Sequence, residues 1–183
     1  MVVPAMSSSD TIIELDGFRR IRDALALMRR ASDSDRDAPK VVDWYLPGFV
    51  GSARVTTTFG DLPIEALRLR DDLRTYSGAN ARVQMVDKIH LDDEFIRTRQ
   101  DALPIRIPAN SFGLGKPMRD ISISPGQEIC PDAHVASTFM PAREMRGRFN
   151  VDTTHSAGLS YYRFHCGEPT IVRVEGIWVR VQP

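Results

Sequence analysis

Apolar residues recur at helical spacing near the N-terminus of the chain. Asp10 stands where it can cap the first turn, and four large apolar residues then follow at intervals of three or four. This pattern predicts an amphipathic α-helix over residues 10–31, after a disordered stretch at residues 1–9. Residues 32–40 carry several charges and no large apolar residue, which is typical of a linker. The apolar face of the predicted helix consists of Phe18, Ile21, Leu25 and Met28.

The pattern changes after the linker. Short runs of β-favouring residues alternate with turn signals such as Ser124-Pro125-Gly126, and no strand–helix–strand alternation occurs. This spacing predicts a mainly β protein, with one all-β domain over residues 41–183. The predicted strands are Arg54–Thr58, Asp72–Tyr76, Ala81–Leu91, Leu103–Ile107, Asp120–Ile123, Val135–Phe139, Leu159–Cys166, Thr170–Val174 and Ile177–Val181.

Composition and charge narrow the range of partners. The 183-residue chain has 24 Lys and Arg against 24 Asp and Glu, so we expect no nucleic-acid partner. No apolar run is long enough for a membrane span, and the first ten residues do not resemble a signal peptide. We therefore expect a cytoplasmic protein, and secretion guided by another signal stays open. Cys130 and Cys166 are expected to be reduced core thiols, with one disulfide between them as the alternative.

Several motifs invite a functional interpretation and do not support one. Gly113-Leu-Gly-Lys is too short for a phosphate-binding loop and precedes a predicted strand, so we expect a glycine-shaped loop. The four histidines lack the spacing of metal ligands, and we expect neither a metal nor a cofactor. The acidic run Asp92-Asp93-Glu94 is expected to be a solvated turn. Trp44, Tyr45 and Trp178 are expected to be core anchors.

Three blocks of sequence resemble a known family. Residues 54–67, continuing to Thr75, are similar to the opening hairpin of the Hint (Hedgehog/intein) domain in its bacterial form. The segment from Ile105 to Gln127 is similar to the family's Pro-Val-Arg-Ile, Ala-Leu-Gly-x-Gly-x-Pro-x-Arg-Asp-Leu and Ser-Pro-x-His segment. Residues 172–178 are similar to its late strand pair. The resemblance covers about residues 44–181 and implies the Hint fold with an N-terminal helix added.

The resemblance also implies a chemistry. In the family, a Cys at the first position attacks the preceding carbonyl, and a His in the Ser-Pro-x-His turn protonates the departing nitrogen. Here Gly48 stands at the Cys position, or Pro47 if the alignment shifts by one residue. Gln127 stands at the His position, and Pro169 stands where many relatives have another His. Gly has no side-chain heteroatom, and the Gln amide does not exchange a proton near neutral pH.

These departures predict a Hint-like protein without autoprocessing activity, more an interaction or scaffold module than an enzyme. The alternative is residual self-cleavage or splicing that uses Ser52 or Cys130 as the nucleophile. A third hypothesis gives the predicted N-terminal helix the main role, as a binding site for an unknown protein partner.

Overall fold

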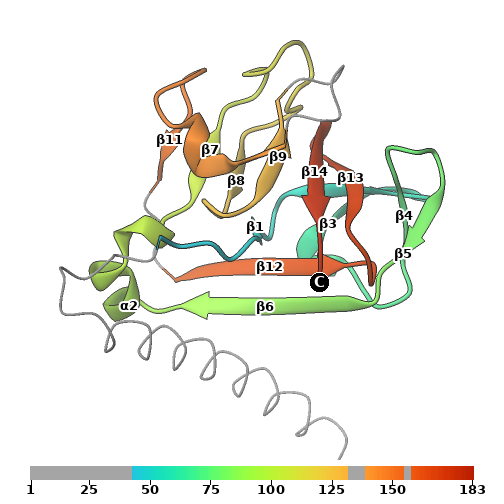
Figure 1. Ribbon diagram of the computed structural model, residues 1–183, viewed down its shortest axis with the longest axis horizontal. Coiled ribbons are helices and arrows are strands. Elements are labelled where there is room, and N and C mark those ends of the chain that lie inside the picture. The colour runs from blue at the N-terminus through green and yellow to red at the C-terminus, as the bar shows by residue number, and fades with distance from the viewer. Residues whose placement is uncertain (1–42, 132–138, 155–157) are drawn as a thin grey trace, which may run out of the picture. The chain divides into compact units, whose positions relative to one another are not determined.

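The computed structural model describes residues 43–131, 139–154 and 158–183 (Figure 1). The predicted N-terminal helix and linker lie outside the described residues, as do His134 and His155. The chain divides into two compact units, Met1–Asp43 and Trp44–Pro183. The second unit contains all the positions that the resemblance singles out, and it is described below by itself.

Short strands dominate the described residues, which confirms the mainly β class. The strands are β1 (Phe49–Val50), β2 (Arg54–Thr57), β3 (Gly60–Pro63), β4 (Asp72–Arg74), β5 (Asn80–Arg82), β6 (Met85–Leu91), β7 (Ile105–Ile107), β8 (Ile121–Ile123), β9 (Glu128–Cys130), β10 (Met140–Pro141), β11 (Asp152–Thr153), β12 (Leu159–His165), β13 (Thr170–Val174) and β14 (Ile177–Val181). The helical elements are α2 (Asp93–Thr98) and the 3-10 turns η1 (Ile64–Ala66), η2 (Gln100–Ala102) and η3 (Ala142–Met145).

The strands form two antiparallel sheets. The first has the order β11-β7-β8-β1-β12-β6, and the second has the order β10-β9-β14-β13-β2-β4-β5, with β3 paired to β2. The two longest strands, β6 and β12, run side by side (Figure 1), with Leu159 opposite Leu91 and His165 opposite Met85. Several neighbours, such as β1 with β12 and β9 with β14, come from distant parts of the chain, so the fold depends on long-range pairing as well as on local hairpins.

Tight turns set the register of the hairpins. Val174 pairs with Ile177, which leaves only Glu175 and Gly176 to connect β13 to β14. Both residues have positive φ, 46° and 86°, as a two-residue turn with the right-handed strand twist requires. The Glu175 side chain is buried and accepts a hydrogen bond from the Arg54 backbone N–H (3.0 Å), which ties this turn to β2.

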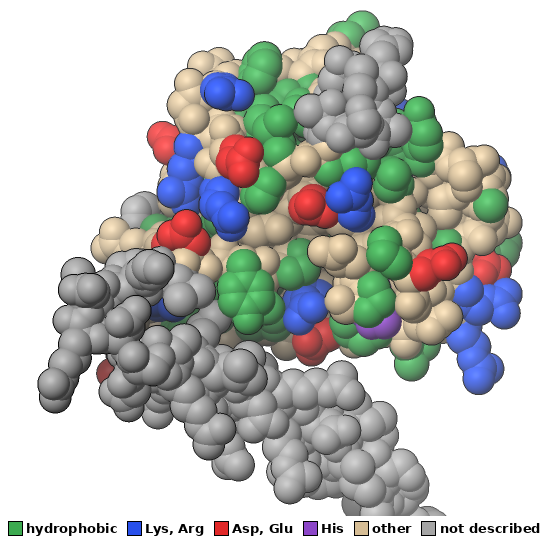
Figure 2. All heavy atoms as spheres, in the orientation of Figure 1, with side chains coloured by type: hydrophobic (Ala, Val, Ile, Leu, Met, Phe, Trp, Pro, Cys, Tyr) green, Lys and Arg blue, Asp and Glu red, His purple; other side chains and the backbone are tan. Residues whose placement is uncertain are grey.

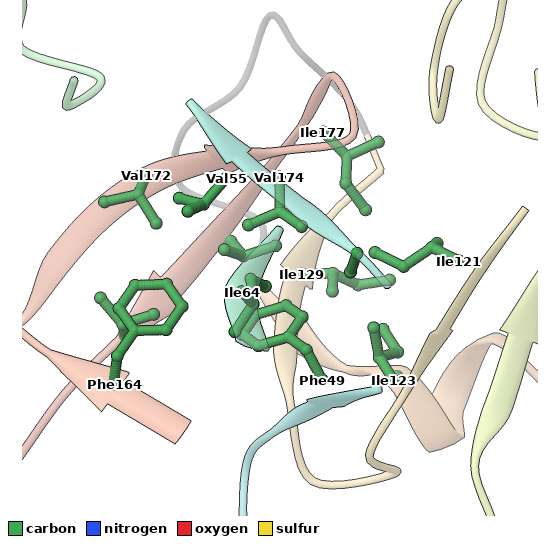
Figure 3. Packing of buried hydrophobic residues seen from close by; sticks show 14 of the residues in the cluster. Phe49, Val55, Ile64, Ile121, Ile123, Ile129, Phe164, Val172, Val174 and Ile177 are labelled. Atoms are coloured by element: carbon green, nitrogen blue, oxygen red, sulfur yellow. The ribbon is translucent and has the colours of Figure 1, made fainter. Parts of the chain in front are cut away.

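The main core fills the space between the two sheets (Figure 3). Alternate residues of each strand point inward, as the period of two requires. Phe49, Ile123 and Phe164 come from the first sheet, and the rings of Phe49 and Phe164 stack with centroids 5.8 Å apart. Val55 and Val174 face them from the second sheet and are fully buried. This core holds β1, and with it the residue that precedes β1, in a fixed place.

A second apolar cluster lies on the other face of the β6–β12 pair. Trp44, Ile89, Leu91, Leu159 and Tyr161 are its large buried members. The α2 and η2 segment contributes Ala102 and the partly buried Phe95 and Ile96. The expectation that Trp44 is a core anchor is confirmed, since only 3% of it is exposed. The same expectation is wrong for Tyr45, which is 50% exposed.

The structure corrects two local predictions. Asp92-Asp93-Glu94 is not a turn but the start of α2, because the Asp92 carboxylate accepts a hydrogen bond from the Phe95 N–H (2.7 Å) and caps the helix. The predicted strand Ala81–Leu91 is two strands, interrupted at Val83–Gln84, where both N–H groups bond outside the ladder. Short strands such as β1, β9 and β11 were not predicted, because two or three residues are too few to show a period.

Candidate functional site

The segment that leads into β1, residues 44–48, is fixed at several points. We call it the entry segment. The Trp44 N–H donates to the Asp101 carboxylate (2.7 Å), and the Trp44 carbonyl accepts from the Arg143 guanidinium (3.3 Å). The indole Nε1–H donates to the Ser124 hydroxyl (2.8 Å), and that hydroxyl donates to the Leu46 carbonyl. Backbone and side chain are therefore both held immediately before Gly48.

The turn of residues 124–127 lies directly against the entry segment. Pro125 supplies a fixed φ inside the turn, and the Gln127 N–H closes it onto the Ser124 carbonyl (3.0 Å). The Ser124 N–H donates to the Gly48 carbonyl (2.8 Å). A Cβ added to Gly126 would lie 2.2 Å from the Tyr45 carbonyl oxygen, so only glycine permits this approach. The two segments that the resemblance links to one site are therefore adjacent.

Gly48 is buried and packed against Tyr161. A Cβ added to Gly48 would lie 2.9 Å from the Tyr161 Cβ and 3.4 Å from its Cγ. Tyr161 has no room to withdraw, since it is fully buried and its hydroxyl donates to the Ala102 carbonyl (2.7 Å). This burial also raises the pKa of the Tyr161 phenol far above its usual range. The space beside Gly48 is therefore occupied by a neutral, buried and hydrogen-bonded aromatic side chain.

The Gln127 side chain points into the second sheet. It is 1% exposed, and its Nε2 donates to the Arg180 carbonyl on β14 (2.8 Å) and to the Glu128 carbonyl (3.1 Å). Arg180 and Glu128 also form an ion pair (3.2 Å). Both amide hydrogens of Gln127 are thus used to join the turn to β14.

Pro169 lies on the other side of β14. It is exposed in the turn before β13, whose first residue, Thr170, pairs with Val181. Since Gln127 bonds to the carbonyl of Arg180, β14 separates Pro169 from Gln127. Pro169 therefore lies one strand away from the place where Gly48 and residues 124–127 meet.

The two alternative nucleophiles differ in their surroundings. Ser52 is exposed in the turn between β1 and β2. Cys130 is a buried thiol in β9, opposite Trp178, three residues and roughly 10 Å along the chain from Gln127. Cys166 is also a buried thiol, and burial raises its pKa, which suppresses the nucleophilic thiolate form.

Electrostatics reinforce the anchoring of the entry segment. The Arg99 guanidinium (2.7 Å) is the main cause of a lowered pKa for the Asp101 carboxyl, and the Trp44 N–H lowers this pKa further. Asp101 is therefore ionised at neutral pH and accepts from Trp44 as a charged group. Within the described parts of the chain, no cluster of three His, Cys, Asp or Glu side chains is arranged to hold a metal ion.

The comparison with protein families decides the identity of this fold. The family model described as Hint domain matches residues 47–180. The chain belongs to the Hint domain family. Among solved structures, a DnaB intein from Synechocystis sp. PCC 6803 is similar, with a TM-score of 0.49, 9% identity and coverage of 75% of this chain and 100% of that chain. The gp41-1 intein has a TM-score of 0.49, 10% identity and coverage of 73% and 98%. The comparison with curated proteins found no match.

The sequence predicted Trp44 as a core anchor but not the hydrogen bonds that hold it. Trp44 lies before the matched residues, and its partners Asp101, Ser124 and Arg143 are scattered along the chain. The one local sequence signal of this packing was Gly126, which lies in a turn where most residue types would fit. Glycine is needed there because the Tyr45 backbone lies directly against it.

Proposed function

We propose that this Hint domain does not process itself and serves as a structural mount for the residues upstream of Gly48. The observation that carries the proposal is the packing at Gly48, where an added Cβ would lie 2.9 Å from the Tyr161 Cβ. A nucleophilic side chain at this position would need space that Tyr161 occupies. The proposal concerns the activity of the domain and not its fold.

The acid–base side of the chemistry supports the same conclusion. Acyl transfer at the Pro47–Gly48 peptide requires a group that can give a proton to the departing nitrogen. Gln127 occupies the expected position, and its amide does not ionise near neutral pH. Its Nε2 is also engaged by the Arg180 and Glu128 carbonyls. Nucleophile and acid act as a unit, so the loss of either one is expected to remove most of the activity.

The anchoring of Trp44 supports a mounting role. An autoprocessing domain that separates from its upstream segment gains nothing from burying that segment in its own core. Here the Trp44 ring is 3% exposed and its backbone N–H and C=O are both hydrogen-bonded to side chains of the domain. A partner bound by residues 1–43 would thereby be connected, through Trp44, to the β domain. A protein partner for the predicted N-terminal helix stays a prediction, which a pull-down with residues 1–40 deleted would check.

The experiment follows the intact mass of the full chain over several days, with and without an added thiol or hydroxylamine. We expect a single mass for the wild type and for the variants Ser52→Ala and Cys130→Ala. In the wild type, fragments ending at Pro47, or at Gly51 if Ser52 attacks the carbonyl that precedes it, would contradict the proposal. Their disappearance in Ser52→Ala or Cys130→Ala would identify the nucleophile of a residual autoprocessing reaction.

A further inference from the structure

Two loops of the described structure meet through an aromatic pair. The first loop, residues 108–120, connects β7 to β8, and the second, residues 146–151, connects η3 to β11. The rings of Phe112 and Phe149 pack edge to face with centroids 5.6 Å apart. Side chains from the two loops therefore share one surface, which we call the loop surface.

The first loop is built to project an apolar tip. The Gly115 N–H donates to the Asn110 side chain (2.7 Å), and the Lys116 N–H donates to the Gly113 carbonyl (2.9 Å). Gly113 and Gly115 have φ values of 117° and 70°, which glycine adopts without strain. Leu114 stands between them at the tip and is 94% exposed. The hydrogen bonds within the loop fix its backbone, and in this conformation the Leu114 side chain points into solvent.

The second loop also exposes a large apolar residue, in an unfavourable backbone conformation. The Val151 N–H donates to the Arg148 carbonyl (2.8 Å), which closes a turn with Phe149 and Asn150 at its centre. Both central residues have positive φ, 53° and 59°. Turns of this kind prefer Asn or Gly at these positions, and a bulky residue is strained there. Phe149 is nevertheless present and 55% exposed.

The charge of the loop surface differs from that of the chain. The chain has equal numbers of acidic and basic residues, whereas the two loops contain four Lys or Arg and one carboxylate, Asp120, which forms an ion pair with Arg106. The cations are Lys116, Arg119, Arg146 and Arg148. Within the described residues, none of these four side chains forms a salt bridge. Figure 2 shows hydrophobic side chains together with basic and acidic ones in the upper part of the molecule.

We propose that the loop surface docks on an anionic lipid bilayer. A bilayer can take up protruding apolar side chains at the boundary between headgroups and acyl chains. The flanking cations would then lie among the lipid phosphates. An acidic peptide would need a groove or strand edge to bury it, and Leu114 protrudes from the fold. Single-stranded nucleic acid would need several exposed aromatic faces, and Phe149 packs its ring on Phe112.

The test measures co-sedimentation of the full chain with vesicles of phosphatidylcholine alone and with about a third of the lipid replaced by phosphatidylglycerol. We expect binding only to the anionic vesicles. Leu114→Ser should weaken the partition about tenfold, since a buried Leu side chain contributes at least that factor. Arg146→Gln with Arg148→Gln should also weaken it, and added salt should reduce what remains.

The matched control is Phe59→Ser. Phe59 is 98% exposed at the tip of the β2–β3 hairpin, away from the two loops in sequence and beside Asp61. We expect this variant to bind as the wild type does. Equal losses in Phe59→Ser and Leu114→Ser would overturn the proposal, as would binding to neither kind of vesicle. The proposal would also be overturned if the chain binds polyglutamate or single-stranded DNA but not vesicles, and if Leu114→Ser leaves that binding unchanged. The cations would then serve a different ligand.

Discussion

Replacing Trp44 by Ala removes the side chain that anchors the entry segment. The ring is 3% exposed, packs edge to face on Phe95 with centroids 5.9 Å apart, and lies 6.2 Å from the Tyr161 ring. Its Nε1–H also donates to the buried Ser124 hydroxyl. Deletion of a buried Trp side chain costs about 3–5 kcal/mol, of which one lost hydrogen bond accounts for about 1 kcal/mol. We therefore expect the free energy of unfolding to fall by about 4 kcal/mol.

The assay is urea unfolding followed by far-UV circular dichroism, with linear extrapolation to zero denaturant. The matched control is Tyr45→Ala, the next residue, whose side chain is 50% exposed. A surface change of this kind is expected to stay within about 0.5 kcal/mol. If Trp44→Ala lowers the free energy of unfolding by less than about 1 kcal/mol, the entry segment is not part of the folded domain and the mounting role fails.

Two further predictions concern the joint and the pH dependence of stability. Gly126→Ala places a Cβ 2.2 Å from the Tyr45 carbonyl oxygen, which belongs to the backbone and cannot rotate away. We therefore expect the variant to be destabilised by about 1–3 kcal/mol in thermal unfolding. A Tm equal to that of the wild type would refute this prediction. Burial, and secondarily the charge of Arg163, lower the pKa of His165 below its ordinary 6.5, and its Nδ1 accepts from the Gly167 N–H. The unfolded chain therefore binds this proton first, so stability present above about pH 6.5 falls as the pH drops through the lower folded pKa. His165→Asn should flatten this slope, and an unchanged slope would exclude His165 as its source.

The sequence was sufficient to predict the fold class and the family. Alternating runs such as Thr170–Val174 and Ile177–Val181 show their period clearly, and both are strands. Strands of two or three residues have no readable period, and their existence depends on partners that are distant in sequence. Phe49–Val50 forms a strand because it lies between β8 and β12.

The candidate site was predictable only as a set of positions. The motif order placed Gly48 beside residues 124–127, and the hydrogen bond from the Ser124 N–H to the Gly48 carbonyl joins them. The direction of the Gln127 side chain could not be predicted, because it depends on a carbonyl of Arg180 in the last strand. The packing of Tyr161 on Gly48 was equally invisible, since it requires the register of β1 on β12.

The central claim is that the positions used for chemistry in the Hint family are taken up by core packing in this chain. The most direct test restores both groups together, as Gly48→Cys with Gln127→His, and follows the intact mass over days while circular dichroism verifies that the variant is folded. The account predicts an uncleaved chain, because the Tyr161 Cβ lies 2.9 Å from the added Cβ and the side chain at residue 127 points toward β14. Release of a fragment ending at Pro47 from the folded variant would contradict it.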